Sequence, residues 1–163
     1  MTILKDKGLR FMDKTVIIRD MTEGDIDRVC ELEAACFSTP FTKKAITELF
    51  SNTSWHFFVA ECDGVVAGYI SMYVIIDEKE IVNVCTDPEY RGLGIGSNLV
   101  CAAIEYEKEK CNTVMLEVRR SNSVAIALYE KFGFISVGVS KNHYSSPRED
   151  AILMNLEINK TEK

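Results

Sequence analysis

Three glycines on alternate positions stand where a strand-like segment runs into a helix-like segment. The stretch VNVCTDPEYRGLGIGSNLV covers residues 82–100, and its glycines are Gly92, Gly94 and Gly96. The first N–H groups of a helix have no intrahelical partner and lie at the positive end of its dipole, so glycines there let a phosphate approach the backbone closely. We therefore predict an anion site. The alternative is a tight turn that requires glycine only for positive φ.

Two common phosphate-binding motifs do not fit this stretch. A dinucleotide fingerprint G-x-G-x-x-G that starts at Gly92 requires a glycine where Ser97 stands. A Walker A loop requires Gly-Lys-Ser/Thr at 97–99, where the chain reads Ser-Asn-Leu. The stretch instead matches R/Q-x-x-G-x-G/A at residues 91–96, after a strand-like segment and Asp-Pro.

That pattern, in this place, resembles the acyl-coenzyme-A loop of the GNAT N-acetyltransferase superfamily. The resemblance implies that backbone N–H groups of the loop hold the pyrophosphate of acetyl-coenzyme A, and that the preceding strand pairs with its pantetheine arm. The residues implied in cofactor binding are Val84, Cys85, Thr86, Arg91, Gly92, Leu93, Gly94, Ile95, Gly96, Ser97 and Asn122.

The segment MLEVRRSNSVAIALYEKFGF, residues 115–134, resembles the ribosomal-protein-alanine N-acetyltransferase branch of this superfamily. It fills every fixed position of the branch pattern L-E-V-R-x-S-N-x-x-A-I-x-L-Y-x-x-x-G-F. N-acetyl transfer requires a deprotonated amine, a polarised thioester carbonyl and a proton for the departing thiolate. The resemblance implies Glu117 as the general base, Tyr129 as the acid that protonates coenzyme A, and Asn122 as a contact to the pantetheine.

The spacing of these residues agrees in part with such roles. Asn122 and Tyr129 stand at i and i+7, so a helix would carry both on one face. Glu117 lies in a strand pattern, on the opposite face from Leu116 and Val118. Taken singly, such a tyrosine is usually a half-buried packing residue and such a glutamate usually faces solvent. Together, and after the glycine loop, the catalytic interpretation is favoured.

The acceptor side departs from the branch pattern. The branch carries F-P-W after its first helix and N-Y-Y…E-D-A before its last strand, where this chain reads FSTPF and NHYSSPREDA. Phe41 replaces the tryptophan, Ser38 and Thr39 are inserted, and His143 replaces the first tyrosine. By resemblance Phe41, His143 and Tyr144 are the candidates for acceptor contact. The alternative for the last two is a polar loop anchored by one aromatic residue.

The elements that position these residues follow from periodicity and from turn signals. Thr22, with Asp25 as a capping box, and Thr42 are expected to begin two helices, and Asp63-Gly64 a two-residue hairpin turn. Strands are expected at 15–21, 55–62, 65–75, 81–86, 113–118, 134–139 and 151–158, with further helices at about 96–110 and 121–134 and a polar loop at 140–150.

This order, an antiparallel meander followed by a strand-helix-strand crossover, predicts a mixed sheet with helices on its faces. The expected fold class is α/β (mixed α+β), and the resemblance implies the GNAT acyl-CoA N-acyltransferase fold with a central, mostly antiparallel sheet. The chain of 163 residues is expected to form one domain over 15–158, with an N-terminal extension at 1–14 and a tail at 159–163.

Composition narrows the classes of partner and cofactor. The formal net charge of -6 opposes a nucleic-acid surface and favours a basic partner. Six cysteines without a C-x-x-C pair, with only two histidines, predict buried thiols and no metal site. No secretory signal is recognisable and the longest apolar run, residues 65–76, is too short to cross a bilayer, so a cytoplasmic protein is expected.

The function that these features imply is transfer of the acetyl group of acetyl-CoA to the N-terminal α-amine of a protein. The resemblance indicates the N-terminal alanine of a small-subunit ribosomal protein (S18), a basic acceptor that suits an acidic chain. Two alternatives stay open from the sequence. One is a GNAT enzyme that acts on lysine or on a small amine, and the other is a coenzyme-A-binding sensor without turnover.

Overall fold

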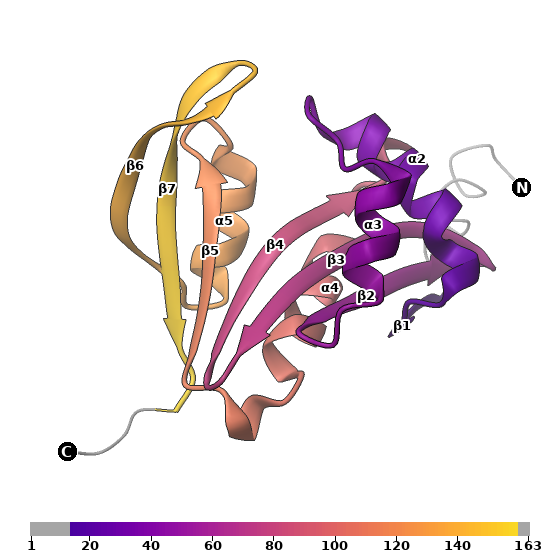
Figure 1. The fold of residues 1–163 in the computed structure, drawn as a ribbon, viewed down its shortest axis with the longest axis horizontal. Helices are drawn as coiled ribbons and strands as arrows, with labels where there is room; N and C mark the ends of the chain where they lie inside the picture. The colour runs from indigo at the N-terminus through magenta and orange to yellow at the C-terminus, as the bar shows by residue number, and fades with distance from the viewer. Residues whose placement is uncertain (1–13, 160–163) are drawn as a thin grey trace, which may run out of the picture.

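The computed structural model describes residues 14–159, and its strands form one sheet in the order β1-β2-β3-β4-β5-β7-β6 (Figure 1). The strands are β1 Val16–Asp20, β2 Trp55–Cys62, β3 Val65–Ile75, β4 Glu78–Thr86, β5 Thr113–Arg119, β6 Ile135–Ser145 and β7 Arg148–Glu157. The helices are α2 Ile26–Cys36, α3 Lys43–Phe50, α4 Ile95–Glu105 and α5 Ser123–Lys131, with short 3-10 turns at Glu23–Asp25, Pro88–Tyr90 and Lys108–Lys110. The predicted element order and mixed sheet are confirmed. Most of the expected extension and tail lies outside the described residues.

The sheet divides at β4 and β5, which form its parallel pair. Their ladder joins Glu78–Ile81 to Thr113–Leu116, while β4 runs on to Thr86 and β5 to Arg119. Figure 1 shows the two strands side by side at one end and diverging toward the other. We call this divergence the splay. Within the described part of the chain, no strand pairs with the edge of β4 that faces it.

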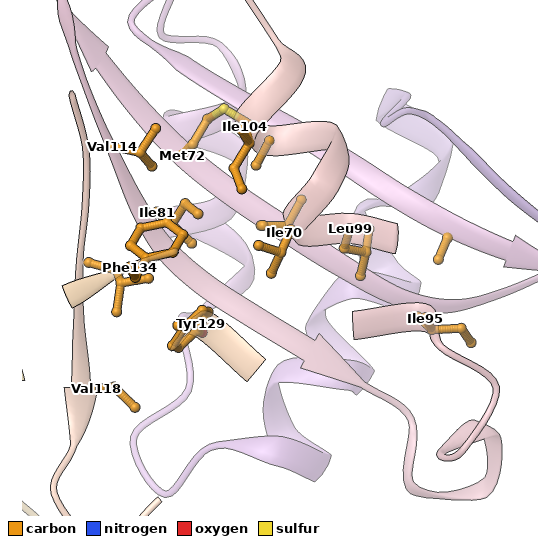
Figure 2. Packing of buried hydrophobic residues seen from close by; sticks show 14 of the residues in the cluster. Ile70, Met72, Ile81, Ile95, Leu99, Ile104, Val114, Val118, Tyr129 and Phe134 are labelled. Atoms are coloured by element: carbon orange, nitrogen blue, oxygen red, sulfur yellow. The ribbon is translucent and has the colours of Figure 1, made fainter. Parts of the chain in front are cut away.

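Two hydrophobic layers cover the two faces of the sheet. Helices α4 and α5 pack on one face, where Leu99, Tyr129 and Phe134 join the larger cluster (Figure 2). Helices α2 and α3 pack on the other face through a second cluster that includes Leu32 and Ile46. Successive strand residues point to opposite faces, which is how the same strands supply both clusters.

The predicted turns and caps are present. Thr42 Oγ1 accepts from Ala45 N at 3.1 Å, and Asp63 and Gly64 both have positive φ, as a type I′ turn requires. Thr22 and Asp25 form the expected capping box, which opens a 3-10 turn before α2.

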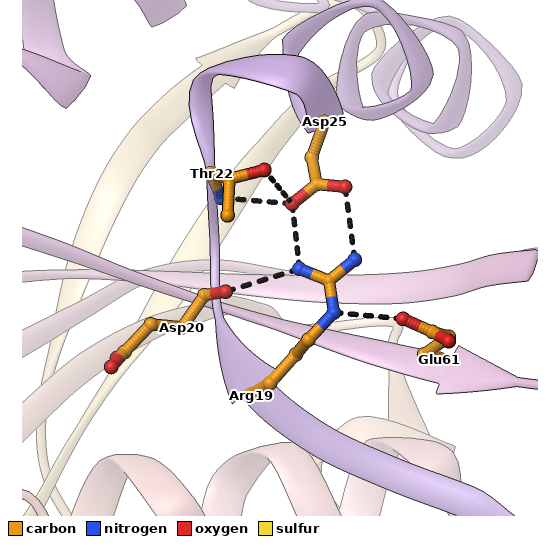
Figure 3. Close-up of polar contacts among 5 residues, drawn as sticks. All are labelled: Arg19, Asp20, Thr22, Asp25 and Glu61. Atoms are coloured by element: carbon orange, nitrogen blue, oxygen red, sulfur yellow. Dashed lines mark hydrogen bonds and ion pairs between the residues drawn. The ribbon is translucent and has the colours of Figure 1, made fainter. Parts of the chain in front are cut away.

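Arg19 joins this capping box to the sheet, as Figure 3 shows. Its Nη1 donates to Asp25 Oδ2 at 2.8 Å, its Nη2 to Asp25 Oδ1 at 3.0 Å, and its Nε to Glu61 Oε2 at 2.8 Å. The bonds from Arg19 are the main cause that lowers the pKa of Asp25 to about 2. The pair therefore favours the ionised carboxylate in the folded state.

A buried lysine binds the C-terminal end of helix α4, from a position between the predicted strands at 65–75 and 81–86. Strand β4 begins at Glu78 instead of Ile81, and Lys79 is fully buried. Its Nζ donates to Ala103 O at 2.7 Å and to Tyr106 O. Burial lowers the pKa of Lys79. The carbonyl groups at a helix C-terminus lack intrahelical donors and favour a cation, so the lysine ties β4 to α4.

The other differences from expectation lie in solvent-facing segments. Helix α4 ends at Glu105 and is followed by a separate 3-10 turn, so it does not reach residue 110. The expected polar loop at 140–150 is mostly strand, because β6 and β7 extend to a turn at Ser146-Pro147. Strand β6 is a mostly exposed edge strand, and its residues 140–145 are largely polar, so the sequence shows no apolar alternation there. No helix among residues 14–159 is long and apolar enough to span a membrane.

Candidate active site

The glycine loop joins the end of β4 to the start of α4. Gly92 and Gly94 have φ of 83° and 76°, and Gly94 is the N-cap of the helix. Asn98 N donates to Gly94 O at 3.0 Å, so the N–H groups of residues 95–97 precede the first helical hydrogen bond. A Cβ placed on Gly92 or Gly94 would meet nothing within 4 Å. The loop thus presents an open helix N-terminus that suits a phosphate.

Gly96 differs from Gly92 and Gly94, because it does not have the positive φ that a tight turn would require of it. It lies in the first turn of α4 and is not among the residues with positive φ. A Cβ there would lie 3.7 Å from Leu128 Cδ2 and 3.9 Å from Thr86 Oγ1, which is ordinary contact. Its backbone conformation therefore does not require glycine.

Arg28 of α2 anchors the segment that leads into the loop. Its Nη2 donates to Asp87 Oδ2 at 2.6 Å, and its Nε donates to Val66 O at 2.9 Å. The backbone N–H of Glu89 donates to Asp87 Oδ1 and is the first cause that lowers the pKa of Asp87. Sequence reasoning missed Arg28, because the helix periodicity gives no indication that this polar residue turns toward β4.

The β4 residues predicted to bind the pantetheine lie at the splay. Val84 and Thr86 are half-buried, whereas the Cys85 side chain is buried on the α2 face. Cys36 Sγ donates to Thr86 O at 3.4 Å, and the neighbouring Cys85 thiol is the main cause that lowers the pKa of Cys36. Only the backbone of Cys85 is then available to a ligand at the strand edge. This free edge and the open helix N-terminus fit a long ligand that carries phosphate at one end.

Glu117 is the first residue of β5 beyond its ladder with β4. It is exposed, while Leu116 and Val118 on the opposite face are buried, as predicted. Its Oε2 lies 2.7 Å from His143 Nε2 of β6. On the neighbouring strand β4, burial is the main cause that raises the pKa of Glu80, and the charge of Glu117 adds to it. Glu80 was not predicted, because Glu78–Glu80 reads as a polar turn.

Tyr129 lies on the other face of the sheet from Glu117. It is buried in the α4/α5 cluster, and its ring meets that of Phe134 edge-on with centroids 5.8 Å apart. Figure 2 shows the two rings near Val118 of β5. Burial, with a smaller contribution from Tyr144, raises the pKa of Tyr129 to about 12. The phenol therefore keeps its proton at any pH near neutrality.

Asn122 begins helix α5 and is not part of its body. Its Oδ1 accepts from Ala125 N at 3.2 Å, so one side-chain atom is used as an N-cap. Asn122 is exposed while Tyr129 is buried, so the two do not share one exposed helix face. The cap leaves the side-chain amide nitrogen as the group that can reach a ligand.

The two acceptor-side segments meet beyond the splay. Ser38, in the insertion between α2 and α3, donates to Ser146 O of the β6–β7 turn. Arg119 of β5 donates to Ser146 O at 3.1 Å and to Pro147 O at 2.9 Å, and its guanidinium lies 4.2 Å from the centroid of the Tyr144 ring. His143 and Tyr144 thus belong to a strand and are not part of a polar loop. Sequence reasoning missed Ser38 and Arg119 as the residues that join these segments.

Phe41 is held by a buried polar group that the sequence did not reveal. Glu33 of α2 is fully buried, and its Oε2 accepts from Phe41 N at 2.8 Å. Its Oε1 accepts from Asn83 Nδ2 at 2.7 Å and from the Tyr69 hydroxyl. Burial, with the nearby Glu33, raises the pKa of Tyr69. The Phe41 segment is therefore fixed to β3 and β4 through one carboxylate.

No group of three or more histidine, cysteine, aspartate and glutamate side chains in the described range 14–159 could hold a metal ion.

Comparison with known proteins shows which family this chain resembles. The profile described as "Acetyltransferase (GNAT) family" matches residues 26–134. A Bacillus subtilis (strain 168) protein, provisionally named as a [ribosomal protein bS18]-alanine N-acetyltransferase, is 41% identical over 150 residues, which are 91% of this chain and 99% of that protein. The Escherichia coli (strain K12) [ribosomal protein bS18]-alanine N-acetyltransferase is 33% identical over 86% of this chain and 97% of its own length.

The fold agrees with a solved structure as well. The crystal structure of the ribosomal-protein-S18-alanine N-acetyltransferase from Escherichia coli superposes with a TM-score of 0.84 at 30% identity, covering 91% of this chain and 97% of that one. The fold class predicted from the sequence is thereby confirmed.

Proposed function

The chain belongs to the acetyltransferase (GNAT) family and is an acetyl-CoA-dependent N-acetyltransferase, and on this premise we propose that it acetylates the N-terminal α-amine of a protein. One observation carries the proposal. The splay has a free strand edge and an open helix N-terminus on the β4 side, and a carboxylate and a phenol, Glu117 and Tyr129, at its β5 side.

Bound acetyl-CoA would supply an activated acetyl thioester in the splay. The backbone N–H groups from Gly92 to Ser97 would hold its pyrophosphate, with the exposed Arg91 adding positive charge beside them. The free edge of β4 at Val84–Thr86 would orient the pantetheine by backbone hydrogen bonds. The Asn122 side-chain nitrogen, which its cap leaves free, would add one further donor.

Glu117 and Tyr129 would divide the proton transfers. Glu117 is exposed on the α2/α3 face, so its carboxylate can take a proton from an arriving ammonium group. Tyr129 comes from the α4/α5 face of the sheet and would give the proton at its Oη to the departing sulfur. The base and the acid would thus act on two different protons.

An N-terminal amine suits a weak base better than lysine does. The pKa of an α-amine is near 8 and that of lysine near 10.4, so at pH 7 a few hundred-fold more of the α-amine is already neutral. A solvent-facing carboxylate such as Glu117 needs to assist only modestly. The chemistry therefore favours an N-terminus over a lysine side chain.

The acceptor proposed here is the N-terminal alanine of a ribosomal protein, bS18 in the first instance. The support is the name shared by the two relatives, each matched over nearly its full length. The net charge of -6 suits a basic acceptor. Phe41, Tyr144 and the contact between Ser38 and Ser146 would border its path to Glu117.

Peptide acetylation followed by mass spectrometry tests this proposal. One peptide carries the first residues of the organism's own bS18, with an alanine at its N-terminus and an internal lysine, and a matched peptide is blocked at the α-amine. We expect a gain of one acetyl group on the free peptide, located on the N-terminal fragment ion, and none on the blocked one. Equal acetylation of both peptides would show that the enzyme acetylates the lysine side chain instead. Release of coenzyme A without a dependence on peptide would instead indicate a sensor.

A further inference from the structure

An irregularity in β6 brings His143 to Glu117. The pairing of β6 with β7 shifts register between Ser140, opposite Ala151, and Tyr144, opposite Glu149. The residues in between bulge from the strand, and Asn142 within them has a φ of 52°. Its N–H donates to Asp150 Oδ1 at 2.8 Å and its Oδ1 accepts from Arg148 Nε at 3.0 Å. Two side chains of β7, Asp150 and Arg148, therefore hold the bulge in place.

The bulge lets His143 reach across a whole strand. Strand β7 lies between β5 and β6, and Glu117 pairs with Leu153, which in turn pairs with Gly138 of β6. The β6 residue in register with Glu117 thus has no side chain. His143 Nε2 nevertheless lies 2.7 Å from Glu117 Oε2, and its Nδ1 lies 3.4 Å from Ser140 Oγ.

The charged and titratable groups around this ring come from four strands. Glu117 of β5 contacts the ring, and both Glu117 and His143 influence the pKa of Glu80 of β4. Tyr144 of β6 meets the ring edge-on at 4.8 Å between centroids. Asp150 of β7 is occupied by the backbone of Asn142 and, at 3.3 Å, by Arg120. Arg119, 4.2 Å from the centroid of the Tyr144 ring, and Arg148, which donates to Asn142, add positive charge beside these carboxylates.

We propose that His143 is a positioning residue for Glu117, which fixes the carboxylate for the acceptor amine. This inference rests on the proposed function. An ionised carboxylate only accepts hydrogen bonds, so a proton on Nε2 would let the imidazole hold Oε2 across the 2.7 Å contact and leave Oε1 for the amine.

Two aromatic substitutions of similar shape distinguish a positioning role of His143 from a packing role. His143→Phe removes the donor, whereas His143→Tyr offers a hydroxyl donor that does not titrate near neutrality. At pH 8 we expect His143→Phe to lower kcat about fivefold, the size of a solvent-exposed charged contact, with the KM for the peptide unchanged. His143→Tyr should recover most of that loss. A rise in KM with an unchanged kcat in His143→Phe would make His143 an acceptor contact and overturn the proposal.

Nuclear magnetic resonance tests the contact without turnover. The chain has only two histidines, and the other, His56, lies 2.8 Å from Asp20 through its own Nε2. Glu117→Ala should abolish the slow exchange of the Nε2 proton of His143 and leave that of His56 unchanged, and Asp20→Ala should do the reverse. An unaffected His143 signal in Glu117→Ala would refute the contact. If the wild type acetylates none of the peptides, the proposed function fails, while this spectrum still decides whether the contact exists.

Discussion

Asn83 donates from its side-chain amide to Glu33 Oε1 at 2.7 Å, and this bond ties β4 to α2 beside the acceptor segments. Glu33 also accepts from Tyr69 and from the backbone N–H of Phe41. Every partner is a donor, which matches a group that only accepts. The buried carboxylate is therefore a hub between the sheet and the segment that precedes α3.

Glu33→Gln should loosen the Phe41 segment. The amide would turn an NH2 group toward one of the present donors, and an unsatisfied buried donor costs ~1–3 kcal/mol. We expect the free energy of unfolding to fall by that amount and the KM for the acceptor peptide to rise severalfold. Tyr69→Phe is the control, since it removes one donor and leaves the Phe41 contact. Denaturant titration and steady-state kinetics check both, and an equal KM in the two variants would contradict the assignment.

Gly94→Val should impair coenzyme A binding, whereas Gly96→Ala should not. Gly94 has a φ of 76°, where a branched side chain costs ~1–2 kcal/mol or more. Gly96 has ordinary backbone geometry, and a methyl group there would meet Leu128 and Thr86 at normal contact distances. Calorimetric titration with coenzyme A on folded protein measures the difference. Unchanged affinity in Gly94→Val would remove the loop from the binding site.

Tyr129→Phe should lower kcat by ~10²–10⁴-fold, the range of a positioned general acid. The ring contact with Phe134 is kept, so thermal stability and coenzyme A affinity should change little. Because the pKa of Tyr129 is raised to about 12, the acid stays protonated, and kcat of the wild type should not fall between pH 8 and 10. Near-full kcat in the variant, under conditions where chemistry limits the rate, would return Tyr129 to a packing role.

Asp25→Asn should destabilise the protein at neutral pH and have little effect in acid. The pKa of Asp25 is lowered to about 2 in the folded chain, below the ordinary value near 3.9. Its ionised form therefore contributes about 2 kcal/mol above pH 5, and the contribution is lost as the pH falls from about 4 to 2. Urea titrations at pH 7 and pH 2 measure the difference. Glu61→Gln, which removes the more exposed partner of Arg19, is the control and should cost less.

The elements predicted from the sequence are those whose causes are local. The Thr42 cap, the Asp63-Gly64 turn and the glycine loop each depend on the conformational preferences of a few adjacent residues. The burial of Leu116 and the exposure of Glu117 follow from strand alternation alone. Such features require no knowledge of the partner strand or helix.

The features that escaped prediction depend on contacts between distant segments. From the sequence, Lys79 and Glu33 would be expected at the surface. Lys79 is buried because it binds the carbonyl groups at the end of α4, and Glu33 is buried because it accepts hydrogen bonds from Tyr69 and Asn83. The contact between His143 and Glu117 depends on a bulge, which is set by Asp150 and Arg148 of the facing strand. The periodicity of a single segment cannot predict such contacts between distant residues.

The short ladder between Glu78–Ile81 and Thr113–Leu116 has a consequence for cooperativity. Strands β1–β4 and β5–β7 share few backbone hydrogen bonds, so side-chain packing in the α4/α5 cluster provides most of the contact between the two halves. A ligand that bonded along the free edge of β4 and also touched α5 would couple the two halves. Amide exchange in β6 and β7 would then slow on coenzyme A binding, although the ligand touches neither strand. Cofactor binding would in this way add backbone contacts to the side-chain packing and make the two halves unfold more cooperatively.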